Sequence, residues 1–144
     1  MSTATATPPS GFARHFSTVA RVLLGLVFFV FGLNGFLNFM PPPPKETLPA
    51  ALVAFSEAMI NTGYLFALVK GTEVLVGALL LLNRFVPLAL ALIAPVIVNI
   101  FAVHVLLAPS GAVISIVILA LELYLAWAYR SAFRPMLAAR ISPG

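Results

Sequence analysis

The feature that most constrains this chain is a set of four long apolar segments that together occupy most of its length. Each segment is close to the roughly 20 residues that a helix needs to cross the hydrocarbon core of a bilayer. Only a helix pairs every backbone N–H and C=O group within such a segment, so the segments predict an all-α fold. They cover residues 18–40, 64–82, 86–107 and 112–133.

The links between the last three segments are short, which predicts antiparallel neighbours and an integral membrane four-helix up-and-down bundle. The composition agrees, since 62% of the residues are hydrophobic and 8% are charged, against about 25% charged in soluble domains. We therefore expect one transmembrane domain over residues 18–133. A disordered cytoplasmic tail at 1–17 and a cytoplasmic tail at 134–144 are expected to flank it.

The stretch between the first two segments has a pattern of its own. It opens with four consecutive prolines, which predict an extended polyproline spacer. Leu52, Phe55 and Met59 then share one helical face with Glu57 opposite, which predicts a short amphipathic helix over about 49–62. We interpret this helix as an anchor at the outer membrane surface, and a lid over the bundle is the alternative.

The distribution of basic residues predicts the orientation of the chain, because cytoplasmic loops carry an excess of Lys and Arg. One side of the predicted bundle carries Lys45 alone, next to Glu46. The other side carries Arg14, Arg21, Arg84, Arg130, Arg134 and Arg140. We therefore expect both termini in the cytoplasm. These arginines lie at the ends of spans rather than in one patch, so we expect no nucleic-acid partner.

A layer of polar side chains interrupts the four apolar segments. Counted from the outer ends of the segments, the depths of Asn34, Lys70, Glu73, Asn99 and Glu122 are about 9 to 15 Å, and Asn38 shares a helical face with Asn34. A lone charge at the centre of a bilayer costs about 2.5–3.5 kcal/mol on insertion scales, so polar residues here suggest a functional site. The candidate ligand-binding residues are Asn34, Asn38, Lys70, Glu73, Asn99 and Glu122.

The charged members of this layer limit what it can do. Lys70 and Glu73 are three residues apart on one helical face, so pairing reduces the penalty of burying them. Glu122 has no cation on its own segment, so we expect one lysine to serve two carboxylates that share a proton. Two interpretations remain open: the side chains tie helices together, or they line a cavity in the outer half of the bilayer. The charges favour the cavity, because amides would tie helices without charge.

Other chemical signatures are missing from the sequence. It contains no cysteine, no zinc-ligand spacing, no phosphate-binding loop and no serine–histidine arrangement. Gly32 and Gly35, or Gly71 and Gly77, suit close helix contacts but form no G-x-x-x-G motif. We therefore expect no metal site and no catalytic activity of the chain on its own.

Two stretches of the sequence resemble the DoxX-like family. They are RVLLGLVFFVFGLNGF at 21–36 and GTEVLVGALLLLNRFVPLALALIAPVIVNIF at 71–101, the second with the Glu73 and Gly77 spacing. The resemblance implies a small four-helix protein of the bacterial inner membrane. Its relatives include a subunit of thiosulfate:quinone oxidoreductase and a member of a mycobacterial membrane oxidoreductase complex. The resemblance carries over no catalytic residue.

Three functions are compatible with these observations. The first is a small-molecule-binding or accessory subunit, whose polar cavity holds an amphiphile such as a quinone or docks a membrane or redox partner. The second is the membrane subunit of a quinone-linked oxidoreductase, with Glu122 as a proton acceptor. The third is a small proton-coupled transporter, for which four helices would need to assemble into a homo-oligomer.

Overall fold

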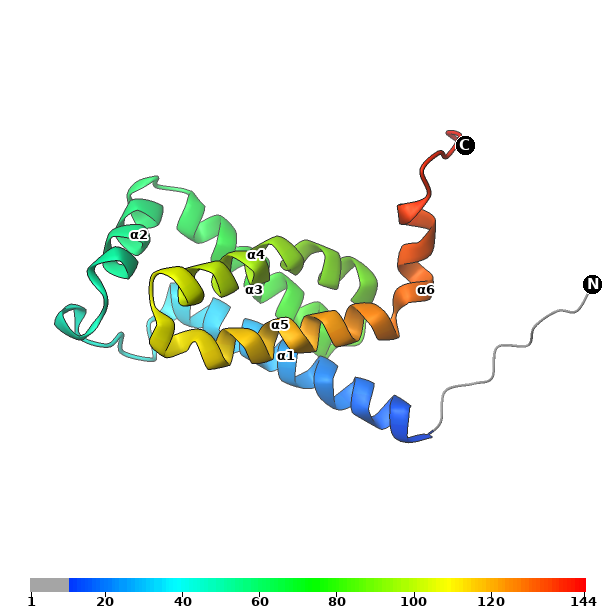
Figure 1. Ribbon diagram of the computed structural model, residues 1–144, viewed down its shortest axis with the longest axis horizontal. Helices are drawn as coiled ribbons and strands as arrows, with labels where there is room; N and C mark the ends of the chain where they lie inside the picture. Colours follow the sequence, from blue (N-terminus) through cyan, green and yellow to red (C-terminus); the bar gives the residue numbers. More distant parts are fainter. Residues whose placement is uncertain (1–10) are drawn as a thin grey trace, which may run out of the picture.

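The computed structural model describes residues 11–144, and within this range the chain consists of helices joined by turns (Figure 1). The range contains no strand, and the predicted all-α fold is confirmed. Three short 3-10 helices lie at Lys45–Thr47, Pro109–Gly111 and Arg134–Leu137. The α-helices are α1 (Gly11–Leu37), α2 (Ala50–Asn61), α3 (Leu65–Leu81), α4 (Val86–Leu106), α5 (Ala112–Ala128) and α6 (Arg130–Phe133).

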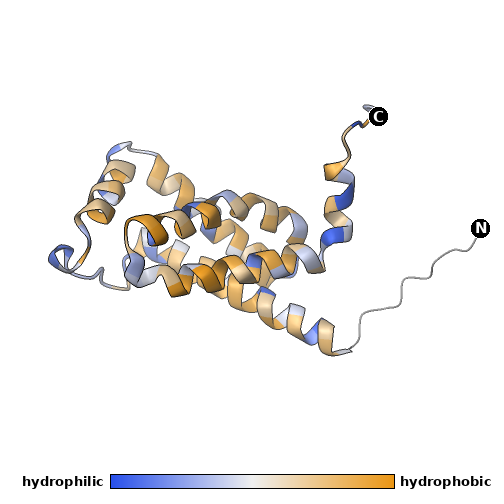
Figure 2. Cartoon of the chain, viewed as in Figure 1, coloured by the Kyte–Doolittle hydropathy of each residue, from blue (hydrophilic) through white to orange (hydrophobic). Residues whose placement is uncertain are grey.

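The described residues contain three or four candidate membrane spans. Three segments are long and apolar enough on their own, namely α1, α4 and Pro109–Ala128, which includes α5. The helices α2 and α3 meet the same criterion only together, and the chain bends by 93° between them. Apolar residues predominate along these helices, whereas α6 mixes polar and apolar residues (Figure 2). The chain is thus a multi-pass membrane protein.

The helices α1, α3, α4 and α5 form a closed bundle in which each helix packs against two others. α1 packs on α3 and α5, and α4 packs on the same two helices. The core between them is largely apolar, and its fully buried side chains include Leu24, Phe28, Leu80, Leu90, Ile93, Ile97 and Leu125. α2 lies at one end of the bundle and α6 at the other, and we call these the α2 end and the α6 end (Figure 1).

The α2 end contains the polyproline spacer and the bend into α3. The observed α2 is close to the predicted helix at 49–62, and none of its residues is buried. Lys45 Nζ donates to Glu57 Oε1 at 2.6 Å, which ties the spacer to α2 at the surface. Gly63 has φ +77, a left-handed conformation that glycine adopts without steric penalty, and it lies at the bend.

The first and last spans, α1 and α5, differ in length from the segments predicted from the sequence. α1 begins at Gly11 rather than 18, so residues 11–17 of the expected tail are helical, and residues 1–10 lie outside the described range. It ends at Leu37 because Asn38 turns left-handed with φ 49, ahead of the prolines. α5 ends at Ala128, and α6 continues from it in a new direction (Figure 1).

Candidate functional site

Lys70 and Glu73 form an ion pair on α3, as their spacing predicts. Lys70 Nζ donates to Glu73 Oε2 at 2.8 Å. The Glu73 side chain is only 5% exposed, whereas that of Lys70 is 21% exposed. The anion therefore lies between the helices. The ammonium group reaches toward the bundle surface and has further N–H donors that are not directed at Glu73.

Two glycines of α1 make room for this pair. A β-carbon on Gly32 would lie 2.9 Å from the Cβ of Glu73, and one on Gly35 would lie 2.6 Å from the Cγ of Lys70. Both distances are shorter than van der Waals contact, so α1 carries no side chain where it crosses the pair. The backbone of α1 thus covers one side of the ion pair.

The same close approach extends along the whole contact between α1 and α3. Gly25 lies against Leu80, with a β-carbon there 3.1 Å from the leucine Cβ. Gly77 lies against the backbone of Phe29, with a β-carbon there 2.7 Å from its Cα. Glycine at such positions lets two helix backbones pack closely in a membrane. Gly71 is different, since a β-carbon there would meet nothing within 4 Å.

Glu122 is buried on α5 without a partner. The residue is 6% exposed, and its Oε2 atom accepts no hydrogen bond from residues 11–144. It lies on the buried stripe of α5 with Ser115, whose Oγ donates to the Ala112 carbonyl oxygen at 2.8 Å. The two ion pairs among the described residues are Lys45–Glu57 and Lys70–Glu73. The structure therefore does not pair Glu122 with Lys70.

The two asparagines of α1 shape the exit from this helix. Asn34 Oδ1 accepts a hydrogen bond from the Met40 N–H at 2.7 Å, and the Asn34 carbonyl oxygen accepts one from the Asn38 N–H at 2.9 Å. Asn34 is half-buried, and Asn38 is exposed at the left-handed turn. These contacts satisfy groups that the end of the helix would leave unpaired.

Asn99 lies on the exposed side of α4. The buried face of this helix consists of Val86, Ala89, Leu90, Ile93 and Ile97, and Val98 next to Asn99 is 60% exposed. The amide of Asn99 therefore points out of the bundle. Of the six predicted residues, the structure brings Lys70 and Glu73 into contact at their side chains. Asn34 and Asn38 lie together at the end of α1, and Asn99 and Glu122 lie apart from both pairs.

The distribution of basic residues predicts Arg21 at the cytoplasmic end of the bundle, and the structure shows in addition that Arg21 is buried. The residue is 8% exposed, and its Nη1 atom donates to the carbonyl oxygen of Leu80 at the end of α3. This carbonyl also accepts a hydrogen bond from the Asn83 N–H at 3.2 Å. The helical period of the sequence could have indicated this burial, because Arg21 lies on the same stripe of α1 as the buried residues Leu24, Gly25, Phe28 and Gly32.

Two surface cavities lie at opposite ends of the molecule. One of about 460 Å³ at the α2 end is lined by Lys45, Glu46 and Glu57, with apolar residues of α2. The other, of about 810 Å³, lies at the α6 end, where α1 begins. We call it the arginine cavity, because Arg14, Arg130 and Arg134 line it together with Tyr124, Trp127 and Tyr129. Neither cavity is lined by any of the six predicted residues.

Comparison with known proteins gives one match. The family described as DoxX matches residues 16–105, a range that includes most of α1, all of α2 and α3, and nearly all of α4. Lys70, Glu73, Asn34, Asn38 and Asn99 lie inside the matched range, and Glu122 and most of the arginine cavity lie beyond it. No curated protein and no solved structure matches the chain.

Proposed function

The chain belongs to the DoxX family, and we propose that this integral membrane protein acts as a small-molecule-binding or accessory subunit without catalytic activity of its own. Its ligand is a small amphiphile with a hydrogen-bond-accepting head, such as a quinone. The bacterial inner membrane is its proposed location, with both termini in the cytoplasm and the α2 end outside.

The observation that carries this proposal is the unequal burial of the Lys70–Glu73 pair. Glu73 is held between α1 and α3, whereas the Lys70 side chain remains 21% exposed. One of the three N–H donors of Lys70 is directed at Glu73, which leaves two for a ligand. Glu73 neutralises and orients the lysine, and a carbonyl or phenolic oxygen approaching from the membrane is its natural acceptor. The site can thus bind an amphiphile without doing chemistry on it.

Asn99 supports the accessory role. It is an exposed amide on a membrane-spanning helix, and such groups commonly form hydrogen bonds with a neighbouring helix. The face that carries it is otherwise apolar, with Leu88, Leu92 and Val98 all exposed. A partner membrane subunit or a second copy of the chain would satisfy the amide and cover this face.

Mass spectrometry of the protein released from native membranes in a polymer-bounded lipid disc tests the ligand proposal. The wild type should retain an amphiphile that Lys70→Met loses. The matched control is Lys45→Met, which removes a lysine from the exposed pair with Glu57 and should retain the ligand. The double variant Lys70→Met/Glu73→Gln removes the charge imbalance and should also lose it. An identical set of bound molecules in all four proteins would contradict the proposal.

A second function, the membrane subunit of a quinone-linked oxidoreductase, is favoured by one observation. Glu122 is buried with a carboxylate oxygen that has no partner among residues 11–144, and such a group can take up a proton released when a quinol is oxidised. The electrons would pass to a redox cofactor in a partner subunit. Quinol oxidation by membranes carrying Glu122→Gln should then fall at least about tenfold relative to wild type. Equal rates would exclude this role for Glu122.

A further inference from the structure

The arginine cavity concentrates positive charge at the α6 end. It collects Arg14 from α1, Arg130 from α6 and Arg134 just beyond α6, and no carboxylate lines it. Both ion pairs within residues 11–144 are made by lysines, so no guanidinium of the cavity has a carboxylate partner there. Guanidinium groups match the geometry of phosphate oxygens and bind them with two parallel hydrogen bonds. The cavity is therefore suited to an anionic, phosphate-like group.

Several side chains of the cavity are held in place. Arg130 Nη1 donates to the Trp127 carbonyl oxygen at 2.9 Å, and its guanidinium lies 4.6 Å from the centre of the Trp127 ring. Ser17 Oγ and the Tyr124 hydroxyl lie 3.0 Å apart and hydrogen-bond α1 to α5. The Phe16 ring packs edge-on against Tyr124, with centroids 4.9 Å apart. The floor of the cavity is thus organised before any ligand enters.

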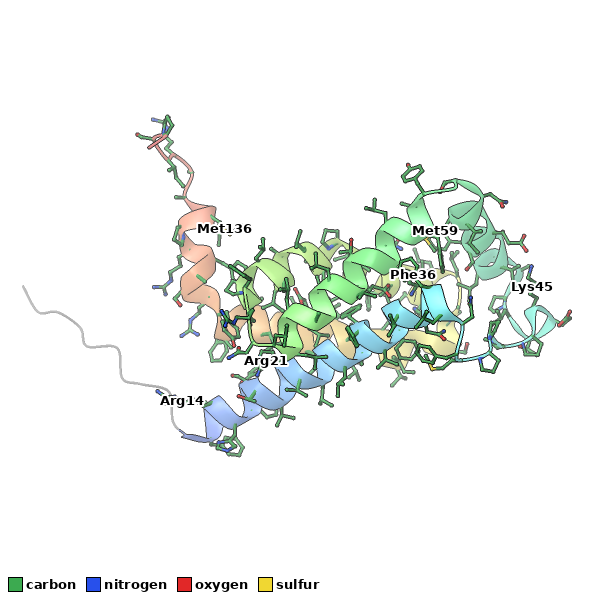
Figure 3. All side chains as sticks on the ribbon, turned by 180° about the vertical axis from the view of Figure 1, so that it is seen from behind. Arg14, Arg21, Phe36, Lys45, Met59 and Met136 are labelled. Carbon is green, nitrogen blue, oxygen red and sulfur yellow. The ribbon has the colours of Figure 1, made fainter. Side chains whose placement is uncertain are left out.

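The position of the cavity relates it to the membrane surface. The junction of α5 and α6 and the residue just beyond α6 supply Trp127, Tyr129, Arg130 and Arg134. This is the level at which aromatic belts and lipid phosphates meet. Arg14 lies near the same end of the molecule, opposite Lys45 (Figure 3). A ligand at this depth can enter from the plane of the bilayer.

An apolar track leads from the cavity along α5 toward the middle of the bundle. Leu123 and Ile116 lie four and eleven residues before Trp127, so the three side chains share one stripe of the helix. They are 61%, 52% and 61% exposed, respectively. An acyl chain attached to a phosphate in the cavity can lie along this stripe, whereas a free phosphate has no apolar part to contact it.

We propose that the arginine cavity binds the phosphodiester headgroup of an anionic membrane phospholipid, whose acyl chain packs along Trp127, Leu123 and Ile116. Arg14 and Arg134 hold the phosphate from two sides, and Arg130, fixed by Trp127, supports it from below. This binding would clamp the first turns of α1 to α5 and α6, in addition to the hydrogen bond between Ser17 and Tyr124. The inference is independent of any ligand at Lys70.

Trp127 is the single tryptophan of the chain and lines the cavity, so its fluorescence reports directly on the lipid beside it. The protein is reconstituted in phosphatidylcholine vesicles that contain brominated phosphatidylglycerol or brominated phosphatidylcholine at equal mole fraction. Bromine quenches tryptophan at short range. Brominated phosphatidylglycerol should quench Trp127 much more strongly, with a preference of about fivefold for each arginine that contacts the phosphate.

Matched variants separate this site from a general charge effect. Arg14→Gln/Arg134→Gln should bring the preference for phosphatidylglycerol close to one. Arg84→Gln/Arg140→Gln removes the same charge outside the cavity and should keep the preference. All four arginines are exposed, so neither double variant opens the core, and circular dichroism should give both the helical spectrum of wild type.

Three results would overturn the proposal. Equal quenching by the two brominated lipids would show that the cavity does not select an anion. An equal loss of preference in both double variants would assign the effect to overall charge. Equal quenching by the two lipids, together with binding of millimolar inorganic phosphate that Arg14→Gln/Arg134→Gln abolishes, would show that the cavity takes a free anion rather than a lipid.

Discussion

Lys70 and Glu73 form an ion pair whose two members differ fourfold in exposure, at 21% and 5% of the side chain. Loss of its partner should cost the anion more, because Glu73 is the more buried of the two and lies against Gly32 of α1. The polar contact and the helix contact are thus one structural unit.

We expect Lys70→Met to destabilise the protein more than the double variant Lys70→Met/Glu73→Gln. The single change leaves Glu73 buried without its cation, and breaking a fully buried pair in this way costs about 3–5 kcal/mol. The effect should be smaller here, because part of Lys70 is exposed. Thermal unfolding in detergent measures it, with Lys45→Met in the exposed pair as a control within about 1 kcal/mol of wild type. Additive effects of the two substitutions would mean that the side chains do not interact.

Alanine at two glycines of α3 should have opposite effects. Gly77→Ala forces a methyl group against the backbone of Phe29 and should destabilise by about 1–3 kcal/mol. Gly71→Ala meets nothing within 4 Å and should be neutral or stabilise by up to about 1 kcal/mol, since alanine favours helix. Thermal unfolding of the two variants in the same detergent provides the comparison. Equal melting temperatures would contradict the close contact of α1 and α3.

Asn34→Leu should loosen the end of α1. It removes the acceptor of the Met40 N–H, which should cost about 1 kcal/mol and speed hydrogen exchange at the Met40 amide. The control is Asn99→Leu, which changes an exposed amide of α4 and should leave exchange at Met40 as in wild type. Slow exchange at Met40 in both variants would show that the Asn34 side chain does not hold this turn.

Arg21→Met should lower the stability of the bundle by about 1–3 kcal/mol, because the Leu80 carbonyl oxygen loses a charged donor within the protein. Arg84→Met provides the comparison, since Arg84 is exposed in the turn that follows α3 and should change stability by less than about 0.5 kcal/mol. Chemical unfolding in mild detergent mixtures resolves the difference. A smaller loss for Arg21→Met than for Arg84→Met would argue against the buried contact.

Reporter fusions test the proposed orientation. The start of α1 and the segment after α5 lie at the same end of the bundle (Figure 1), so we expect fusions after Arg84 and Gly144 to report the cytoplasm. A fusion after Thr47 should report the outside. Because α2 and α3 meet the criterion for a span only as a bent pair, the same signal at Thr47 and at Arg84 would instead indicate a re-entrant segment and three spans.

Much of the fold could be predicted from the sequence because the bilayer admits so few solutions. Apolar length alone indicated α3 and α4 to within a residue or two, and the prolines indicated where the helical path had to break. The helix ends were harder, since α1 continues through the polar residues His15 and Ser17, whose side chains bond to carbonyls of their own helix. Such local bonds leave no hydrophobic signal.

The candidate site was predicted less completely than the fold. The Lys70–Glu73 pair followed from spacing within one helix, which sequence shows directly. Depth placed Asn99 and Glu122 in the same layer, but depth says nothing of direction around the helix axis. Asn99 points outward because it lies off the buried face of α4, whereas Glu122 points inward because it lies on the buried face of α5. The arginine cavity depends on where α1 crosses α5 and α6, a relation between distant segments that one sequence does not reveal.

The unequal lengths of the spanning helices have a consequence for the surrounding lipid. At 1.5 Å per residue, the 17 residues of α3 extend about 25 Å, and the 27 residues of α1 about 40 Å. The hydrocarbon of an average bilayer is about 30 Å thick. Next to α3, either the hydrocarbon layer becomes thinner or α2 sinks into the membrane surface. The longer α1 either tilts or projects beyond the hydrocarbon layer. The protein therefore imposes a thickness gradient on the membrane around it, and longer acyl chains should disfavour the fold first at α3.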